Sequence, residues 1–407
     1  MNDADVLIVG GGPAGMMAGL LFARAGVRVI VLEKHGDFLR DFRGDTVHPS
    51  TLDIIDELGL LDRFLALPHD RVEDVSAVIG GRAWRIADFR HLPGRGRFIA
   101  MMPQWHFIDF LAREARAYPG FTLRMDSEVT GLIEDAGRVV GVRTEDAALR
   151  ARLVITADGR GSRLREAVAL PRIDLGAPID VFWFRIPKRP TARNETQGYI
   201  AGGEMVVTID RGDYFQCARV IVKGSADGVR ARGLAAFRTA VAHAAPPLAD
   251  GIAALQNWEA VKLLSVSLDR LTRWHRLGLL AIGDAAHAMS PVGGVGINLA
   301  VQDAVAAANV LAEPIARGDD PDPLLAQVQA RRMPVVRLIQ GLQRTIHRRV
   351  LGAALAGQVV DAPWPVRLLD RVPMLQRVPA RVLGLGVRRE HIRSPNTKVR
   401  ESSARRA

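Results

Sequence analysis

The chain has 407 residues, 48% of them hydrophobic, which is enough to bury a sizeable core in two lobes rather than one. Its single cysteine, Cys217, excludes an intrachain disulfide framework, and no uninterrupted apolar run approaches the roughly 18 residues of a membrane-spanning helix. The net charge of +11 is concentrated partly in residues 388–407, but with 5% aromatic residues and no recognition motif it does not favour nucleic-acid binding.

The N-terminal residues follow the pattern of a dinucleotide-binding unit. Ala4–Val9 is typical of a short buried parallel strand, and the glycine-rich turn Gly10–Gly15 comes next. Pro13–Ala25 has apolar residues at helical spacing, and Val27–Leu32 predicts a second buried strand. The order of strand, glycine turn, helix and strand therefore predicts a bound dinucleotide.

Each glycine of this turn has an expected role. Gly10 permits the tight turn, Gly12 lets the backbone approach a pyrophosphate, and Gly15 lets helix and strand pack closely. The start of the helix adds N–H groups for the phosphates. Glu33, at the end of the second strand, is expected to accept hydrogen bonds from ribose hydroxyls. This unit alone does not distinguish NAD from FAD.

A second glycine-and-acid segment lies nearly 300 residues later. Leu279–Ile282 predicts a buried strand, after which Gly283 frees the backbone so that Asp284 can reach the polyol chain of a flavin. The glycine-rich loop Val292–Gly296 then opens an Ala- and Val-rich helix over about residues 297–311. The partial positive charge of a helix start stabilises an anionic reduced flavin. The two distant segments together predict FAD.

Four ordered segments resemble the class A FAD-dependent monooxygenases of the para-hydroxybenzoate hydroxylase type, over about residues 4–345. They are the glycine turn, the segment RGDTVHP with the helix after it, the segment TADGRGS, and the late Gly-Asp segment with its loop. The resemblance also covers MPQ at the start of a helix. It implies cofactor contacts by Arg43, Gln104, Asp158, Gly159, Gly283, Asp284, Gly296, Ile297 and Asn298.

Three arginines follow the Asp158–Gly159 turn: Arg160, Arg163 and Arg165. We interpret them as a phosphate-facing surface, because the resemblance associates this turn with both FAD and a transiently docked NAD(P)H. The resemblance further implies that O2 adds to the reduced flavin. The resulting C4a-hydroperoxide would hydroxylate an aromatic or polycyclic small molecule. The alternatives are a flavin-dependent dehydrogenase or reductase of the same fold, a monooxygenase that acts by epoxidation or ring-expanding insertion, and a non-catalytic flavin-binding protein.

The middle of the chain lacks glycine fingerprints and reads mostly as strand. The expected strands are Val181–Ile186, Glu204–Ile209, Tyr214–Val222 and Val261–Leu268, with one helix near residues 229–244. In a doubly wound flavoprotein this inserted, mostly antiparallel sheet would form the floor of a substrate cavity. Trp183 alternates with Phe182 and Phe184, so either Trp183 or the two phenylalanines face that cavity.

Three residues are candidates for catalysis. His48 is either a proton-handling group near the ring or a local hydrogen-bonding group at a helix start. Pro291 precedes the glycine pair that would leave room for oxygen above the ring. Tyr214 carries a phenol that could bind or help ionise a phenolic substrate. His287 is expected only to order the Gly-Asp segment.

The C-terminal region is expected to be helical and basic. Residues 322–349 predict a long helix that is broken or bent at Pro334. Residues 364–387 hold short amphipathic pieces that would lie on a membrane surface, pack over the flavin domain, or contact a second subunit. Nothing after Arg388 is predicted to be ordered.

The sequence therefore predicts an α/β protein with a Rossmann-type FAD-binding fold, an inserted substrate sheet and a helical C-terminal region. The expected division is 1–170 and 276–345 for FAD binding, 171–275 for substrate, and 346–407 for C-terminal helices and a basic tail. No Cys/His cluster has the spacing of metal ligands. The expected partners are a small-molecule substrate and O2, in a cytoplasmic monomer or homodimer without an export signal.

Overall fold

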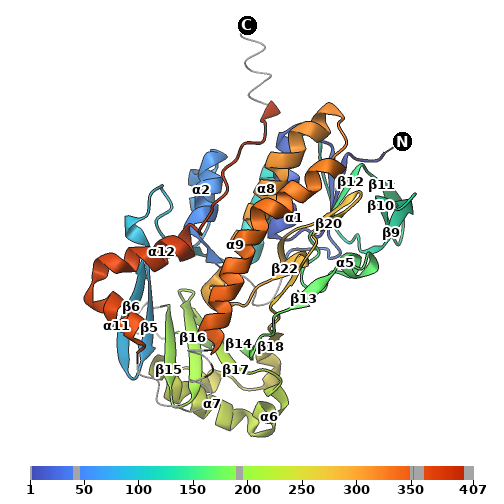
Figure 1. Ribbon diagram of the computed structural model, residues 1–407. Coiled ribbons are helices and arrows are strands. Elements are labelled where there is room, and N and C mark those ends of the chain that lie inside the picture. Colours follow the sequence, from blue (N-terminus) through green and yellow to red (C-terminus); the bar gives the residue numbers. More distant parts are fainter. Residues whose placement is uncertain (1, 40–45, 189–195, 349–351, 353–361, 398–407) are drawn as a thin grey trace.

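A computed structural model describes residues 2–39, 46–188, 196–348, 352 and 362–397. An α/β lobe built from both ends of the chain, blue and orange in Figure 1, lies above a lobe built around a sheet from the middle of the chain, shown in green. Arg43 falls outside the described residues. The predicted fold class, a Rossmann-type FAD-binding fold with an inserted sheet and a helical C-terminal region, is confirmed.

A six-stranded sheet forms the centre of the α/β lobe. Its order is β20 (His275–Arg276), β21 (Leu279–Ala281), β12 (Leu153–Thr156), β1 (Val6–Val9), β2 (Val29–Leu32) and β8 (Phe121–Arg124). All neighbours are parallel except β20 and β21. The middle strands are buried on both faces, which explains their continuous apolar sequences.

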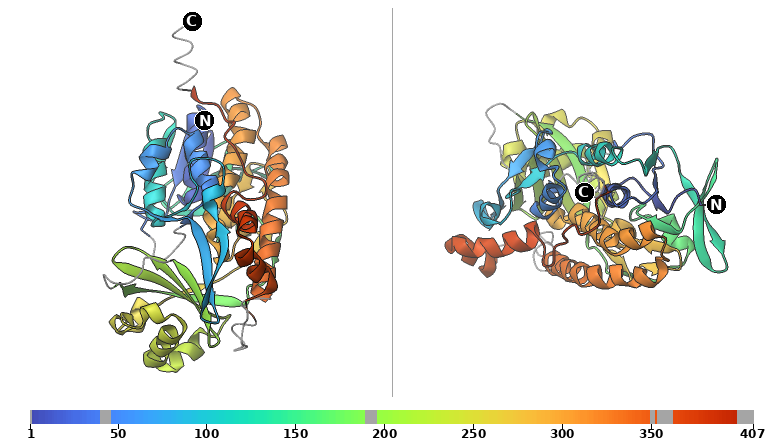
Figure 2. Two further views of the ribbon diagram at one scale, coloured as in Figure 1. Left: turned by 90° about the vertical axis from the view of Figure 1, so that its left-hand side faces the viewer. Right: turned by 90° about the horizontal axis from the view of Figure 1, so that it is seen from above.

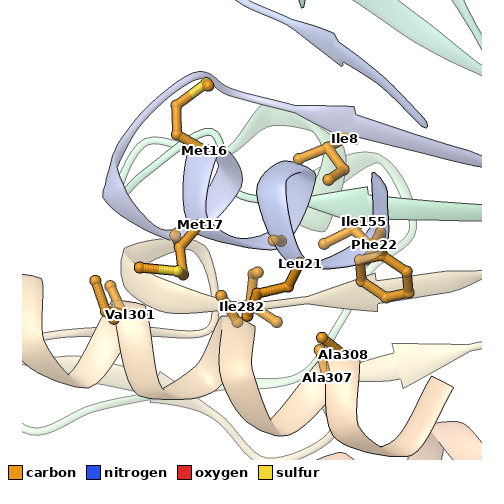
Figure 3. Packing of buried hydrophobic residues seen from close by; sticks show 14 of the residues in the cluster. Ile8, Met16, Met17, Leu21, Phe22, Ile155, Ile282, Val301, Ala307 and Ala308 are labelled. Atoms are coloured by element: carbon orange, nitrogen blue, oxygen red, sulfur yellow. The ribbon is translucent and has the colours of Figure 1, made fainter. Parts of the chain in front are cut away.

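Helix α1 (Pro13–Arg24) connects β1 and β2 and packs against the long helix α8 (Gly296–Arg317). Figure 3 shows Met17 of α1 beside Val301 of α8, and Leu21 above Ala307 and Ala308. The small alanine side chains let the two helix backbones approach closely. The glycine turn at the start of the chain and the late glycine loop therefore open two helices that lie against each other.

Within the described residues, one helical stretch, Val292–Arg317, is long and apolar enough by composition to cross a membrane. However, 83% of its apolar window is buried inside the protein, as expected for a core helix. Helix α9 (Leu325–Ile346) covers α8 and continues through Pro334. Of the predicted break or bend at Pro334, the break is wrong: the helix is continuous there, and buried Met333, Val335 and Val336 on either side pack against the core.

A seven-stranded sheet forms the second lobe. Its order is β18 (Lys262–Ser265), β14 (Ile179–Pro187), β17 (Tyr214–Val222), β16 (Glu204–Asp210), β15 (Gln197–Ala201), β5 (Asp74–Ile79) and β6 (Arg82–Asp88). Only the β15–β5 pair is parallel. The expected helix over 229–244 is two helices, α6 (Ala226–Ala231) and α7 (Gly233–Ala244), separated where Gly233 has φ +86°.

Strands β5 and β6 come from residues 74–88, inside the segment assigned to the FAD-binding lobe. They nevertheless extend the sheet of the segment 171–275. The domain boundaries stay a prediction, to which these two strands are added as part of the second lobe.

Alternation along β14 places its aromatic residues on opposite faces of the sheet. Phe182 and Phe184 pack edge-on against Phe237 of α7, with ring centroids 5.8 and 5.4 Å apart, and Trp183 lies on the opposite face.

Three small three-stranded sheets accompany the two large ones. One joins β3 (Thr46–Val47), β7 (Ile99–Met101) and β4 (Asp70–Val72); the second joins β9 (Val129–Asp135), β10 (Arg138–Thr144) and β11 (Ala148–Arg150); the third joins β13 (Arg172–Asp174), β19 (Asp269–Leu271) and β22 (His287–Ala288). The remaining helices are α2 (Pro49–Glu57), α3 (Leu61–Leu65), α4 (Gln104–Ala115), α5 (Arg163–Ala167), α11 (Trp364–Arg371) and α12 (Arg377–Gly384).

The segment after α12 is ordered, and the prediction of no order beyond Arg388 is wrong. The chain returns along the α/β lobe, shown in red in Figures 1 and 2, up to residue 397. Glu57 of α2 accepts the N–H of Ile392 at 2.8 Å, and Asn309 of α8 accepts the N–H of Arg393 at 2.7 Å. These partners lie far away in the sequence, so local composition gave no sign of them.

Candidate functional site

The glycine turn after β1 has the geometry expected of a nucleotide-binding turn. Gly10 has φ +104°, and a Cβ there would lie 2.5 Å from the carbonyl oxygen of Ala157 at the end of β12. A Cβ at Gly15 would lie 1.9 Å from the carbonyl oxygen of Gly10. By contrast, a Cβ at Gly12 would meet no atom of the described residues within 4 Å. The first and third glycines are required by the protein itself, and the second faces open space.

The N-terminus of α1 is left for a ligand. Gly12 is its N-cap, and no side chain caps the helix. Glu33 supports the turn: its Oε2 accepts the N–H of Gly11 at 2.9 Å, and its Oε1 lies 2.5 Å from Nδ1 of His35. Glu33 thus lies beside the turn as predicted, and its contact with a ribose stays a prediction.

The Asp158–Gly159 turn lies beside the same glycines and contacts the late Gly-Asp segment. Thr156 donates its hydroxyl proton to Oδ1 of Asp158 at 2.5 Å, and Gly159 has φ +86°. Nη2 of Arg160 lies 3.1 Å from Oδ2 of Asp284, and both side chains are about a third exposed. This pair joins two motifs that are 124 residues apart in the chain.

Arg165 corrects the phosphate-facing interpretation of this turn. Ser162 caps α5 by accepting the backbone N–H of Arg165, and the arginine side chain points into the protein. Its guanidinium donates to the carbonyl oxygens of Ala285 and Arg160 and lies 3.6 Å from Asp269. Arg165 is buried and supports the site from the interior of the protein. Arg163 is exposed and pairs with Glu128 at 3.1 Å.

Gly283 lies between the two helices that frame the site. It has φ +60°, and a Cβ there would lie 3.0 Å from Cβ of Ala14 on α1 and 3.3 Å from Cβ of Ala300 on α8. Its N–H donates to Oδ2 of Asp303 at 3.1 Å. Asp284 therefore follows a residue that both helices hold in place.

Asp303 anchors a buried ionic network that the sequence did not reveal. Its Oδ2 lies 2.6 Å from Nε2 of His287, and its Oδ1 accepts from Nε of Arg332 on α9 at 2.8 Å. Burial disfavours the ionised carboxylate, but His287 and Arg332 outweigh it and lower the pKa of Asp303 below its ordinary value. Arg332 also lies 3.6 Å from Glu390, in the ordered C-terminal segment. His287 orders this region as expected.

The loop that opens α8 is held by the segment containing β3 and α2. Thr46 donates its hydroxyl proton to the carbonyl oxygen of Gly294 at 2.8 Å. Oδ1 of Asn298 accepts the N–H of His48 at 2.9 Å and the hydroxyl of Thr51 at 2.7 Å. No side chain caps the start of α8. Asn298, predicted as a cofactor contact, therefore positions the start of α2, and α8 begins without a capping side chain.

His48 is fully buried at the start of α2. Its Nδ1 is 2.9 Å from the carbonyl oxygen of Leu383, so Nδ1 carries the proton and donates it. Burial lowers the pKa of His48 to about 4, although this hydrogen bond acts in the opposite direction. The imidazole is therefore neutral at pH 7, with Nε2 as an unprotonated acceptor that has no protein partner among the described residues.

The other predicted residues differ in how close they come to this region. Gln104 begins α4 as predicted, and β7 just before it pairs with β3. Pro291 begins the loop whose next residue, Val292, packs against β14 and β17. Tyr214 lies opposite Pro187 at the start of β17, with Arg185 5.1 Å from its ring centroid. At about 3.3 Å per residue, Tyr214 is roughly 13 Å from Ala218, the nearest β17 residue in the cluster of Val292.

Comparison with known proteins also indicates an FAD-binding protein. A family model described as an FAD binding domain matches residues 3–341. The chain is 34% identical to 6-methylpretetramide 4-monooxygenase of Streptomyces rimosus over 391 residues, which cover 93% of this chain and 91% of the relative. The chain belongs to the FAD-dependent flavoprotein monooxygenases of the para-hydroxybenzoate hydroxylase type.

Two further proteins are similar to this monooxygenase. Rifampicin monooxygenase of Rhodococcus hoagii is 28% identical over 353 residues, covering 82% of this chain and 68% of that protein. The solved structure of a probable FAD-dependent monooxygenase from Pseudomonas aeruginosa superimposes with a TM-score of 0.75 at 22% identity, covering 87% of this chain and 98% of that chain. The second likeness shows the shared fold.

The described residues of the monooxygenase fit FAD. Open space at Gly12 and the uncapped start of α1 suit a diphosphate, since both leave backbone N–H groups for an anion. The glycine loop and uncapped start of α8 lie on the other side of Gly283, where a flavin ring would gain from the helix dipole. The two elements are joined through Gly283 and through the Arg160–Asp284 pair.

A cavity of about 330 Å³ opens beside the loop of the monooxygenase. Its lining comes from residues 175–178 and from Arg344, His347 and Arg348 at the end of α9. Nε2 of His347 is 2.8 Å from the hydroxyl oxygen of Ser290, the residue before Pro291. The volume is at the lower end of the range found for small-molecule sites.

Proposed function

We propose that this monooxygenase uses NAD(P)H and O2 to hydroxylate an aromatic or polycyclic small molecule. The observation that carries the proposal is the convergence of the glycine turn, the Asp158–Gly159 turn and the Gly283–Asp284 segment on one site. When bound there, FAD supplies the redox chemistry that activates oxygen. The protein contributes binding, orientation and exclusion of water.

The proposed cofactor contacts follow the two framing helices. Gly10, Gly12 and Gly15 with the start of α1 hold the diphosphate, and Glu33 holds the ribose. Asp284 binds the ribityl chain, and Gly296, Ile297 and Asn298 bring the positive end of α8 to the ring. Arg43, Gln104, Asp158 and Gly159 complete the proposed set. The Arg160–Asp284 ion pair supports this arrangement, because it holds the Asp284 carboxylate at the junction of the motifs.

The substrate is proposed to lie between the loop and the sheet. The sheet face there carries Val181, Trp183 and Val207, which pack in the same cluster as Val292. An apolar face with one indole suits a flat aromatic molecule, since aromatic rings stack or pack edge-on. Trp183 Nε1 is buried without a protein partner among the described residues, which leaves one donor for a substrate oxygen.

His48 and Pro291 are proposed to act at the ring. His48 reaches the loop through Leu383, because its Nδ1 bonds the Leu383 carbonyl and a Cβ at Gly293 would lie 3.2 Å from Leu383 Cδ1. With Nδ1 protonated, Nε2 of His48 can accept a hydrogen bond or a proton from the reacting groups. Tyr214 remains a proposed substrate-binding phenol with less geometric support, because it lies at the far end of β17.

Oxygen labelling tests this function directly. The purified protein is mixed with FAD, NADPH and 18O-labelled O2, and a panel of phenols and polycyclic aromatic compounds is screened by mass spectrometry. The proposal expects substrate-stimulated NADPH oxidation and one labelled oxygen atom in the product. Turnover under anaerobic conditions with an artificial acceptor, and no label in any product, would instead favour the dehydrogenase or reductase.

A further inference from the structure

The C-terminal arm, defined as residues 364–388, contains α11, α12 and the short turn between them. It lies along β6 and projects from the edge of the molecule, as the right-hand view of Figure 2 shows. Its inner side is attached to the body: Val366 packs against Ile79 and Ile200, and Ala380 is fully buried. The arm is therefore a fixed part of the fold with a separate outer side.

The outer side of the arm is unusually apolar. Trp364 is 71% exposed and Met374 is 70% exposed. Seven of the fourteen exposed large hydrophobic residues among the described residues lie on the arm: Trp364, Leu368, Val372, Met374, Leu375, Val378 and Val387. Apolar residues scattered singly on a surface need no explanation, but this concentration within 25 residues marks a contact surface.

The charges on the arm are almost all positive. It holds five arginines, all of them exposed: Arg367, Arg371, Arg377, Arg381 and Arg388. Its one acidic residue, Asp370, lies 2.8 Å from Arg82 of β6 and is therefore paired with the body. On α11, Arg371 is seven residues from Trp364 and three from Leu368, which places all three on one helical face. The outer side thus combines apolar residues with arginines that have no acidic partner among the described residues.

We propose that the C-terminal arm docks onto a membrane surface containing anionic lipids. Apolar side chains with a tryptophan enter the boundary between headgroups and acyl chains, and the arginines bind lipid phosphates. A second copy of this chain is the weaker occupant, because contact between two arms would oppose like charges with no free carboxylate to compensate. Charge complementarity therefore favours an anionic lipid.

Docking would place the candidate site close to the membrane. The last turn of α12 contacts the site directly, since the Leu383 carbonyl accepts from His48 and Leu383 Cδ1 lies near Gly293. An apolar substrate leaving the lipid would then travel a short path to the loop. This consequence rests on the proposed function, whereas the docking itself does not.

Vesicle sedimentation with the full-length, FAD-loaded protein tests the proposal. Vesicles of phosphatidylcholine alone are compared with vesicles that also contain phosphatidylglycerol, at low and high salt. The variants are Trp364→Ser with Met374→Ser, and Arg371→Gln with Arg381→Gln; the matched control is Leu277→Ser, which changes an exposed leucine elsewhere. Circular dichroism and bound-FAD absorbance show that each variant is folded.

The expected result is sedimentation with the anionic vesicles only, weakened by salt. The arginine variant should bind at least about tenfold more weakly, because every arginine near an anionic surface contributes roughly fivefold. The Trp364 and Met374 variant should also bind more weakly, because it removes the two most exposed apolar side chains of the arm. The control should bind like the wild type. The proposal is overturned if the wild type does not sediment, or if both arm variants sediment like the wild type. An arm-dependent dimer in light scattering without vesicle binding also overturns it.

Discussion

On the cofactor side of the candidate site, backbone geometry determines which residue can stand at the key glycine positions. On the substrate side, the packing of side chains determines the residue type. A Cβ at Gly10 or Gly15 would clash with a backbone carbonyl oxygen, and Gly283 combines a left-handed φ of +60° with close contact to two alanines, so glycine is favoured there by the fold alone. Trp183 and Val181 on the sheet could be exchanged for other apolar residues with little backbone change. These three glycines should therefore tolerate almost no substitution, whereas the substrate side should accept many.

The largest expected effect is at Gly15. Gly15→Ala would place a Cβ 1.9 Å from the carbonyl oxygen of Gly10, and we expect a loss of more than about 4 kcal/mol of unfolding free energy. Gly12→Ala is the matched control, because its Cβ meets no atom within 4 Å. It should unfold within about 1 kcal/mol of the wild type yet bind FAD less well. Urea unfolding and absorbance of bound FAD measure both; equal stabilities of the two variants would contradict the account.

The next largest effect is expected at the buried ionic network around Asp303. Asp303→Asn leaves Arg332 and His287 without their shared carboxylate, which should cost about 3–5 kcal/mol in urea unfolding. Asp227→Asn is the control: Asp227 is 97% exposed and pairs with Arg230 at the surface, so the loss should be at most about 1 kcal/mol. If the two variants lose similar amounts of unfolding free energy, the network does not hold Gly283 in place.

His48 should make stability depend on pH. Its pKa is about 4 when folded and about 6.5 when unfolded, so between these values the unfolded state binds the proton and the folded state does not. Wild-type stability should fall as the pH drops from 6.5 towards 4, by about 3 kcal/mol. His48→Asn retains a donor near Leu383 and should lose this pH dependence. His48→Ala should be less stable than the wild type at pH 7 and should also lose this pH dependence. A wild-type pH dependence in the Asn variant would exclude His48 as its source.

Asp284 gives a smaller effect, on binding. Asp284→Ala removes a charged hydrogen-bond partner and should weaken FAD binding about 10- to 150-fold, while the fold is retained. Glu128→Ala serves as the control, because it removes only the exposed pair with the neighbouring Arg163. Titration of the apoprotein with FAD measures both affinities. An Asp284→Ala variant that binds FAD like the wild type would remove Asp284 from the site.

The smallest effect is expected at Tyr214, on the substrate side. Tyr214 lies at the start of β17, away from the residues around Val292. Tyr214→Phe keeps the ring beside Arg185 and should change kcat/KM by less than about threefold. Steady-state kinetics with any accepted substrate decides this. A hundredfold loss would make the phenol a catalytic group after all.

The same contrast explains what the sequence could predict. The glycine turn, the Gly283–Asp284 segment and the strands that lead into them have local signatures, because backbone conformation restricts the residue type there. The role of Asp303 has no such signature, since its partner Arg332 is 29 residues away on another helix. The order of the segment around Ile392 likewise depends on Glu57 and Asn309, which only the folded chain brings near.

Alternation along β14 illustrates a partial success. The pattern at residues 182–184 placed Trp183 and the two phenylalanines on opposite faces of the strand, but it did not show which face points towards the cavity. Helix α7 covers the face of the two phenylalanines, because Phe237 packs on Phe182 and Phe184. The prediction for Arg165 was wrong for a similar reason: its guanidinium contacts the Ala285 carbonyl and Asp269 in the interior, where composition suggested a surface. Position within the fold, not residue type, determined both outcomes.

The central claim is that two segments more than 270 residues apart bind one FAD. Its most direct test is titration of the apoprotein with FAD for the wild type, Gly12→Val and Asp284→Ala, with stoichiometry and affinity measured by calorimetry. The account predicts one FAD per chain, and weaker binding in both variants with their folds intact. A variant at either segment that binds FAD with wild-type affinity would contradict the claim that both segments belong to one site.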